Sequence, residues 1–288
     1  FIHFAFLNLD TDQAPHTMQS TANSNKIATQ LLKAIWHAVQ GNEHLLNRVA
    51  FKGAGELPSV FAVTDLAAAS MGAAGLALSS LLDAMDLVSG GVHTTSTKTI
   101  SVDRRLASFW FAYSLRPIGW QPTSAEDFVM GDYETSDGWI RLHTNAPHHR
   151  AAALRALKLT APSGRADIIQ AVAVWPADAL ETKVLAEGGC AATMRSWQDW
   201  QAHPHGQAVL SEPLLHWQSG AVNAKPLWSF NRSRPLQVLK VLDMTRVLGG
   251  PSATRMLAGL GAEVLRIDPP WWDEPTLAPE MTLGKRCT

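Results

Sequence analysis

Two adjacent glycines lie between a short apolar run and a helical pattern near the end of this 288-residue chain. Residues 241–270 read VLDMTRVLGGPSATRMLAGLGAEVLRIDPP, a pattern that predicts a strand, a turn, a helix and a second strand. Gly249 and Gly250 allow the backbone to come close to a ligand, and Pro251 suits the first turn of a helix. The free amides at such a helix start could hold a phosphate or another polar group.

The same spacing also fits a βαβ unit that binds no ligand. We expect strands over 237–244 and 263–267, a helix over 252–260, and Gly261 as the helix stop. The stretch has neither the G-x-G-x-x-G pattern of dinucleotide sites nor the lysine of a P-loop. The spacing alone does not identify a ligand.

Histidines form two groups that could suggest a metal site. His143, His148 and His149 cluster around a predicted turn, but no carboxylate or cysteine completes a ligand set, so polar loop residues are the simpler interpretation. His203 and His205 lie in a Trp-rich region, where packing against aromatic rings explains them. We therefore predict no metal site.

The composition is that of a globular protein, with 46% hydrophobic and 17% charged residues. A formal charge of -1 argues against nucleic-acid binding, which needs a basic face. Cys190 and Cys287 are far apart, so a reducing, cytoplasmic compartment is the simplest interpretation. No apolar stretch is read as long enough to span a membrane, and we predict no membrane partner.

Apolar periodicity predicts a mainly helical first half followed by a small α+β region. Residues 1–26 are polar after a short apolar start and are expected to be poorly ordered. Further elements are helices over 27–49, 60–82 and 102–115, a strand over 139–143, a helix from Pro147, and helices over 168–174 and 177–186. The Gly-, Asn-, Ser- and Pro-rich residues 218–235 indicate a domain boundary.

The residue order near the end of the chain resembles the opening of a family III CoA-transferase (the CaiB/BaiF group of formyl-CoA transferases, carnitine CoA-transferases and methylacyl-CoA racemases). The family pattern runs V-L-D-x-T-x-x-x-x-G-P, then A-T-x-x-L-A-x-L-G-A-x-V, an acidic residue, and a later K-R-S or K-R-C. The matching residues are Val241, Leu242, Asp243, Thr245, Gly250, Pro251, Ala253, Thr254, Leu257, Ala258, Gly261, Ala262, Val264, Asp268, Lys285 and Arg286. The resemblance implies an α/β fold in which a helical and small α+β region precedes the first βαβ of a Rossmann-like large domain.

Two upstream segments are similar to later parts of the same family. DGWIRLHTNAPHHRAAALRAL is similar to its small-domain strand and helix, and TMRSWQDWQAHPHGQAVLSEPLL to a later segment. In an ordinary member both follow the first βαβ, whereas here they precede it. The resemblance therefore implies a fragment of a tandem protein: the back part of a first copy (27–217, with its small domain at about 131–217), a linker (218–235) and the start of a second copy (236–288).

Family III enzymes use an aspartate nucleophile, which attacks an acyl-CoA thioester, forms an anhydride and then an aspartyl-CoA thioester, and passes CoA to an acceptor carboxylate. By resemblance Asp65 lies where the nucleophile of a first copy would be. The alternative is that Asp65, or Thr64 before it, caps a packed helix. A working nucleophile is then expected in the second copy, beyond Thr288.

The family places the CoA nucleotide against the turn after the first strand. Carried over by position, the contact residues are Arg246, Val247, Leu248 and Gly249. Pro269 replaces a basic residue that often follows the second-strand acid. Lys285 and Arg286 could attract phosphate, or they could be solvated surface cations.

The resemblance implies an enzyme that forms a homodimer and whose substrates are an acyl-CoA and a carboxylic acid. It implies no covalently bound cofactor, with coenzyme A entering as part of the substrate. A 2-methylacyl-CoA racemase is an alternative, but racemisation needs a proton acceptor and a donor, commonly a histidine beside the aspartate, and residue 64 is a threonine. A second alternative is that this region is a catalytically degenerate scaffold half.

Overall fold

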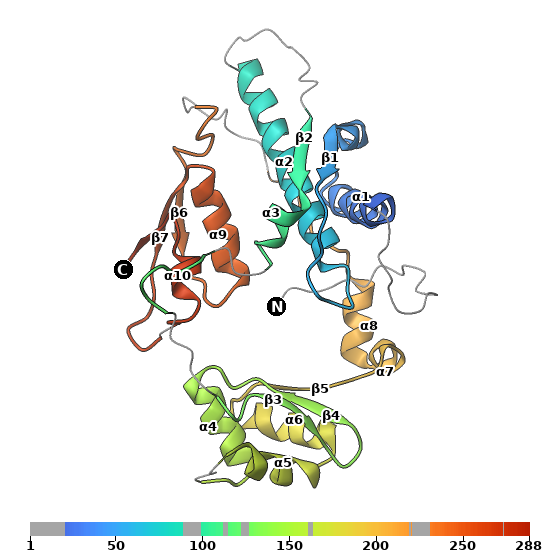
Figure 1. The fold of residues 1–288 in the computed structure, drawn as a ribbon, viewed down its shortest axis with the longest axis vertical. Coiled ribbons are helices and arrows are strands. Elements are labelled where there is room, and N and C mark those ends of the chain that lie inside the picture. Colours follow the sequence, from blue (N-terminus) through green and yellow to red (C-terminus); the bar gives the residue numbers. More distant parts are fainter. Residues whose placement is uncertain are drawn as a thin grey trace. The chain divides into compact units, whose positions relative to one another are not determined.

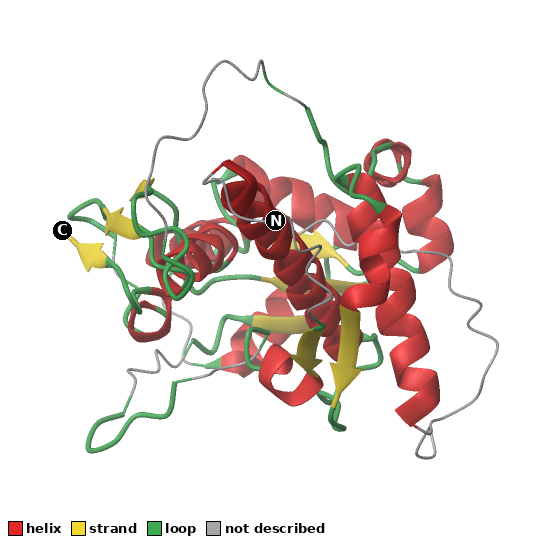
Figure 2. Cartoon of the chain, turned by 90° about the horizontal axis from the view of Figure 1, so that it is seen from above, coloured by secondary structure: helices red, strands yellow, loops and turns green. Residues whose placement is uncertain are grey.

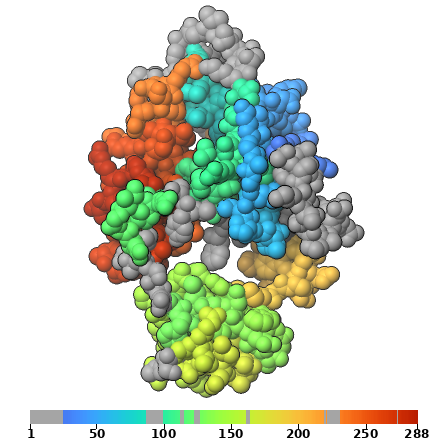
Figure 3. Space-filling model, in the orientation of Figure 1, coloured from blue at the N-terminus to red at the C-terminus, as the bar shows by residue number. Residues whose placement is uncertain are grey.

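The computed structural model describes residues 21–88, 99–111, 115–121, 127–160, 164–218, 220, 231–272 and 274–288. In this part of the chain the fold is mixed α/β, with helices and three small sheets (Figure 2). The chain divides into two compact units, the first made of Phe1–Pro122 with Glu212–Thr288 and the second of Thr123–Ser211. In Figure 3 the second unit runs from green to yellow-orange, and most of the first is blue to green or orange to red.

The amino-terminal part of the first unit is a helix pair with a short parallel sheet. Its elements are α1 (Thr21–Ala38), the 3-10 helix η1 (Glu43–Arg48), β1 (Val49–Lys52), α2 (Val63–Val88), β2 (Ile100–Asp103) and α3 (Arg104–Ser108) (Figure 1). Strand β1 pairs with β2, with Val49 opposite Ile100. The buried alanines 67–69 of α2 pack in the clusters that also contain Ala28 and Leu32 of α1. Small side chains let the two helices approach closely.

The carboxyl end of the first predicted helix is wrong. The helix predicted over 27–49 ends at Ala38, and Val49 belongs to β1. The chain turns because Gly41 lies against the Trp36 indole, where a Cβ would come within 2.2 Å, and the Trp36 Nε1 donates to the Asn42 carbonyl. This close approach permits no side chain at position 41.

The helix predicted over 102–115 is confirmed only over α3 and is wrong in the described residues on either side of it. Val102 lies in β2, and α3 covers only Arg104–Ser108, with residues 112–114 outside the described part. Asp103 caps α3, because its Oδ1 accepts from the Leu106 amide at 3.0 Å. The pairing of β2 with β1, a contact between residues distant in sequence, overrides the helical periodicity.

Helix α2 corrects the expectation about membrane-length segments. Over Val63–Asp86 it is long and apolar enough to cross a membrane by length and composition. In the structure it packs against α1, α3 and the β1–β2 sheet. A helix that is apolar on several faces can also be a core helix.

The second unit is a three-stranded antiparallel sheet with helices against it. Its elements are β3 (Gly131–Glu134), β4 (Trp139–Leu142), α4 (Pro147–Ala156), α5 (Arg165–Ala173), α6 (Ala177–Ala186), β5 (Ala191–Thr193), α7 (Trp197–Ala202) and α8 (Pro204–Ser211). The strand order is β3-β4-β5. Asp137 anchors the hairpin by accepting from the Ala177 amide at 2.8 Å. The predicted strand over 139–143 and the helix from Pro147 are confirmed.

The carboxyl-terminal part of the first unit is a βαβ unit with a third strand. Its elements are β6 (Lys240–Asp243), α9 (Gly249–Gly259), β7 (Glu263–Arg266), α10 (Ala278–Met281) and β8 (Arg286–Cys287). Strands β6, β7 and β8 are parallel, in that order. Gly261 has φ of 106° and ends α9, since the Ala262 amide donates back to the Leu257 carbonyl. The predicted strand–helix–strand order is confirmed, although α9 begins at Gly249 rather than at residue 252.

This βαβ part belongs to the same compact unit as the amino-terminal helices. The Arg255 guanidinium of α9 lies 4.4 Å from the Trp110 ring centre, and the Leu115 amide donates to Glu280 at 2.8 Å. The predicted boundary at 218–235 falls largely on residues outside the described part. The division into two family copies stays a prediction, as does the continuation into a Rossmann-like domain.

Candidate functional site

The turn between β6 and α9, residues 244–250, is here called the bend. It leads into the amino end of α9, which no side chain caps. Among the described residues, nothing accepts from the amides of Gly249 and Gly250, while the Ser252 amide donates to the Leu248 carbonyl at 2.8 Å. Free amides at a helix start carry partial positive charge, so the bend has the chemistry of an anion site.

The two glycines of the bend have different roles. A Cβ on Gly250 would lie 2.4 Å from the Thr245 Cβ, so the packing of the bend requires glycine there. A Cβ on Gly249 would meet nothing within 4 Å. Position 249 is therefore open, and its exposed backbone is accessible to a ligand.

A buried ion pair between Lys285 and Asp243 stabilises the bend. Lys285 donates from Nζ to Asp243 Oδ2 and to the Pro251 carbonyl, both at 2.8 Å, and the side chains of Lys285 and Asp243 are 0% exposed. Asp243 also accepts from Thr245, through the amide at 3.0 Å and the hydroxyl at 2.6 Å, and from the Thr254 hydroxyl at 2.7 Å. The carboxylate thus ties the end of β6 to the bend, to α9 and to the residue before β8.

These donors decide the ionisation of Asp243. Burial alone would raise the pKa of Asp243, but the hydrogen bonds from Lys285 and the two threonines outweigh burial and hold that pKa well below its ordinary value. The carboxylate is charged at neutral pH, and the ion pair is complete.

A second hydrogen-bond network, through Glu274 and Arg266, stabilises the bend at Val247. Val247 has φ of 67°, a left-handed conformation that β-branched residues rarely adopt. Its amide donates to Glu274 Oε1 at 2.7 Å, and Glu274 Oε2 accepts from Arg266 Nη2 at 2.9 Å. Arg266 is buried at the end of β7 and also binds Asp268. The pKa of Arg266 is raised: burial opposes this, but the carboxylates of Asp268 and Glu274 outweigh it.

The predicted contact residues of the bend are exposed. Arg246, Val247, Leu248 and Gly249 all present surface. The Arg246 guanidinium lies over the rings of Trp271 and Trp272, at 5.5 and 4.8 Å from their centres. It therefore adds a cation beside the bend.

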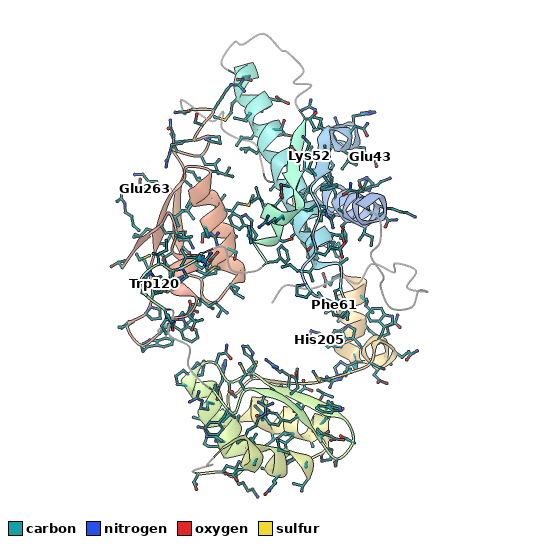
Figure 4. All side chains as sticks on the ribbon, viewed as in Figure 1. Glu43, Lys52, Phe61, Trp120, His205 and Glu263 are labelled. Atoms are coloured by element: carbon teal, nitrogen blue, oxygen red, sulfur yellow. The ribbon has the colours of Figure 1, made fainter. Side chains whose placement is uncertain are left out.

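Lys285 and Arg286 have different environments. The interpretation of both as solvated surface cations is wrong for Lys285, whose ammonium is enclosed by Asp243 and Pro251. Arg286 is exposed and pairs with Glu263 of β7 at 2.9 Å. Figure 4 labels Glu263, whose side chain projects outward from its strand. Of the two cations, only Arg286 presents its charge to solvent.

Asp65 lies in a different environment, at the start of α2. Its Oδ1 accepts from Arg104 Nη1 at 2.8 Å, and the side chains of Asp65 and Arg104 are 6% and 2% exposed. Glu56 lies 3.7 Å from Arg104 Nη2. Burial raises the pKa of Asp65 above its ordinary value, and Arg104 opposes that shift.

The alternative that Asp65 or Thr64 caps this helix is wrong. Helix α2 begins at Val63, so both residues lie inside its first turn. The Thr64 hydroxyl accepts from the Leu57 amide at 2.9 Å and from Ser108, and Asp65 is taken up by Arg104. Both side chains join the helix to other segments and do not satisfy its own amides. Among the described residues, no hydrogen bond or ion pair joins Asp65 to the bend.

The sequence interpretation missed Arg104, Arg266 and Glu274. Arg266 follows a buried strand residue by two positions, so its charge on the buried face was a signal that could have been found. Arg104 and Glu274 follow no local pattern, because their partners are distant in the sequence.

The described residues contain no group of three histidine, cysteine, aspartate or glutamate side chains that could hold a metal ion. The His148 and His149 rings contact each other, with centres 4.2 Å apart. Burial, together with His148 and His143, lowers the pKa of His149. His203 stacks on Trp200 as expected for a packed histidine.

Residues 236–282, which include the bend, match the model of CoA-transferase family III. An acyl-CoA transferase of Gibberella moniliformis is 28% identical over 150 residues, which cover 47% of this chain and 26% of that protein. Human succinyl-CoA:glutarate CoA-transferase is 39% identical over 70 residues, covering 22% and 16%. A formyl-CoA:oxalate CoA-transferase of Escherichia coli O81 is 52% identical over 44 residues, covering 15% and 11%.

The chain spans at most 26% of the length of these relatives. The match to the Gibberella protein is longer than the 236–282 segment, so the likeness is not confined to that segment. The motif expected from V-L-D-x-T to L-G-A-x-V is the part that the family model recognises. Over this segment the chain is similar to CoA-transferase family III.

Proposed function

We propose that the protein moves CoA between an acyl-CoA thioester and a carboxylic acid, and that the bend holds the nucleotide end of CoA. The observation that carries the proposal is the uncapped amino end of α9, with free amides at Gly249 and Gly250, inside the segment that matches the family. CoA carries phosphates, and phosphates bind well at helix amino ends. Arg246 adds positive charge at the bend itself.

The chemistry proposed is covalent transfer through an aspartate. The carboxylate attacks the thioester carbonyl, giving an acyl-aspartyl anhydride and CoA thiolate. The thiolate then attacks the aspartyl carbonyl and releases the acyl group as a carboxylate. An acceptor carboxylate reverses these steps and leaves with CoA, so each thioester bond broken is replaced by another activated acyl bond.

A second candidate role applies to the part of the chain around Asp65. The enclosure of Asp65 by Arg104 favours a scaffold role, because a nucleophile must reach a thioester carbonyl and this carboxylate is buried and ion-paired. On this proposal the attacking aspartate belongs to the second copy. The homodimer and the reducing compartment expected from the sequence stay proposals of the same kind.

Calorimetric titration of the full chain with CoA tests the binding proposal. We expect CoA to bind and pantetheine, which lacks the nucleotide, to bind at least about tenfold more weakly, since charge-assisted phosphate–amide hydrogen bonds are stronger than neutral ones and tenfold is about 1.4 kcal/mol. The absence of measurable affinity for CoA and for acetyl-CoA would refute the proposal.

A matched pair of variants locates the site. Gly249→Asp places a negative charge in open space at the helix start, and Gly249→Asn places an uncharged side chain of the same shape there. We expect the aspartate variant to lose CoA affinity by about tenfold more than the asparagine variant, because like charges a few ångströms apart repel by about 1 to 4 kcal/mol. Equal affinities of the two variants would place the phosphates elsewhere.

A further inference from the structure

Three charged side chains between residues 274 and 285 reach back to the bend and to α9. Glu274 accepts from the Val247 amide, Glu280 pairs with Arg255 of α9 at 2.6 Å, and Lys285 binds Asp243 and the Pro251 carbonyl. All three contacts join this stretch to residues about 25 to 42 positions earlier in the chain. We call residues 274–285 the clasp.

Glu274 has the most direct effect on the bend. One oxygen of its carboxylate accepts from the Val247 amide, and the other accepts from the buried Arg266 guanidinium. The Glu274 side chain is almost fully buried. The Arg266 contact holds the carboxylate in the position from which it accepts from Val247. The Val247 amide is therefore already used by the protein, and the amides of Gly249 and Gly250 at the start of α9 are among the donors left in the bend.

Val247 explains why a clasp is needed. Its backbone has φ of 67°, where a side chain branched at Cβ is strained, and no ligand is needed to hold it there because Glu274 does so. A bend released from this conformation would no longer direct the two glycine amides in one direction. Preorganised donors bind more tightly than donors that must be ordered on binding.

We propose that Glu274, supported by Arg266, is a positioning residue that fixes the bend in its ligand-binding conformation. The inference rests on the proposed CoA site, from whose donors it removes the Val247 amide. Val247 then contributes shape and surface to the site and no hydrogen bond to the ligand.

The test compares Glu274→Ala and Glu274→Gln in the full chain with two readouts: hydrogen exchange at the Val247 amide and calorimetric affinity for CoA. In Glu274→Ala we expect the Val247 amide to exchange about tenfold faster or more, and the CoA affinity to fall about tenfold, as for loss of a charge-assisted hydrogen bond. Glu274→Gln keeps an oxygen acceptor and is expected to recover part of both. Glu187→Ala, which removes a carboxylate paired with Arg155 and Lys183 in the second unit, is the control and should change neither readout.

A Val247→Gly background separates positioning from a general loss of structure. Glycine adopts positive φ without strain, so Glu274→Ala should cost less than about threefold in CoA affinity in that background. An equal loss in both backgrounds would overturn the positioning role, and so would unchanged Val247 exchange in Glu274→Ala. If wild type does not bind CoA while Glu274→Ala still releases the Val247 amide, the proposed function fails and the clasp stands as a device that shapes the bend.

Discussion

Two aspartates of the first unit are paired with a cation at the same distance and have opposite pKa shifts. Asp65 meets Arg104 at 2.8 Å, and Asp243 meets Lys285 at 2.8 Å, each pair with almost no exposed side chain. Burial raises the pKa of Asp65, whereas for Asp243 hydrogen bonds overcome burial and lower the pKa. The difference lies in the number of donors. Asp243 accepts also from the Thr245 amide and from two hydroxyls. Asp65 has Arg104 as its side-chain donor and the Ala28 backbone as a weaker one, and the nearby Glu56 carboxylate adds to the rise of its pKa.

One cation alone does not replace the hydration that a carboxylate loses when it is buried. Each further hydrogen bond favours the charged form, and only the Asp243 site has enough of them. The Asp243 site lies in the segment that the family model matches, under the bend, whereas the Asp65 site joins helices of the amino-terminal part. The pair whose carboxylate has more hydrogen-bond donors therefore lies under the candidate site.

The largest expected effect comes from removing the cation of each pair. Lys285→Met leaves an ionised carboxylate in the protein interior and should lower the free energy of unfolding by about 3 to 5 kcal/mol. Arg104→Met should cost less, about 1 to 3 kcal/mol, because Asp65 is the carboxyl that more readily takes up a proton. Urea unfolding of the full chain at pH 7 measures both. If Arg104→Met lowered the free energy of unfolding more than Lys285→Met, Asp65 rather than Asp243 would be the carboxylate that depends more on its cation.

The close packing around Gly250 predicts that substitutions at the two glycines of the bend have different effects on the free energy of unfolding. Gly250→Ala places a Cβ 2.4 Å from Thr245 and should disturb the donors of Asp243, at a cost of about 1 to 3 kcal/mol. Gly249→Ala is the matched control, since its Cβ meets nothing within 4 Å. Its unfolding free energy should stay within about 0.5 kcal/mol of wild type. Thermal or urea unfolding distinguishes the two, and equal losses would contradict the packing argument.

The pH dependence of stability should differ in sign between the two sites. The raised pKa of Asp65 means that its contribution is present below its ordinary pKa of 3.8 and is lost as the pH rises through the higher folded pKa. The lowered pKa of Asp243 means that its contribution is present above 3.8 and is lost only as the pH falls through the lower folded pKa.

Urea unfolding between pH 3 and pH 7 checks these signs. As the pH rises above about 4, the stability of wild type relative to Asp65→Asn should decrease. Relative to Asp243→Asn, wild type should gain stability as the pH rises through the acidic range and then hold it. Parallel curves for the two comparisons would show that the donors around Asp243 do not set its ionisation.

The smallest expected effect is on catalysis by Asp65. If the buried pair is a scaffold element, Asp65→Asn leaves CoA transfer by the full-length protein within about twofold of wild type, since no transition-state contact is removed. Hydroxylamine trapping of an acyl or CoA adduct, followed by peptide mapping, checks the same point. An adduct on Asp65 would make it the nucleophile and break the comparison with Asp243.

Local sequence predicted those elements whose signals lie within a few residues. The order of strand, glycine turn, helix and strand over 237–267 is confirmed, with Gly261 as the helix stop, because the periodicity and the glycine act locally. The hairpin strand after Asp137–Gly138 is confirmed for the same reason. The start of the helix predicted over 102–115 is wrong because residues 102 and 103 lie in β2, which pairs with β1 about fifty residues earlier.

The amino-acid sequence alone determined that this chain carries the family III motif, with free amides expected at a glycine turn before a helix. Only the tertiary structure decided which charged side chains contact that turn and which are held elsewhere. Lys285 is drawn inward by Asp243, Glu274 takes the Val247 amide, and Asp65 is enclosed by Arg104. The physical reason is that the ionisation and exposure of a side chain depend on the donors and the solvent around it, and folding brings those donors from distant parts of the chain.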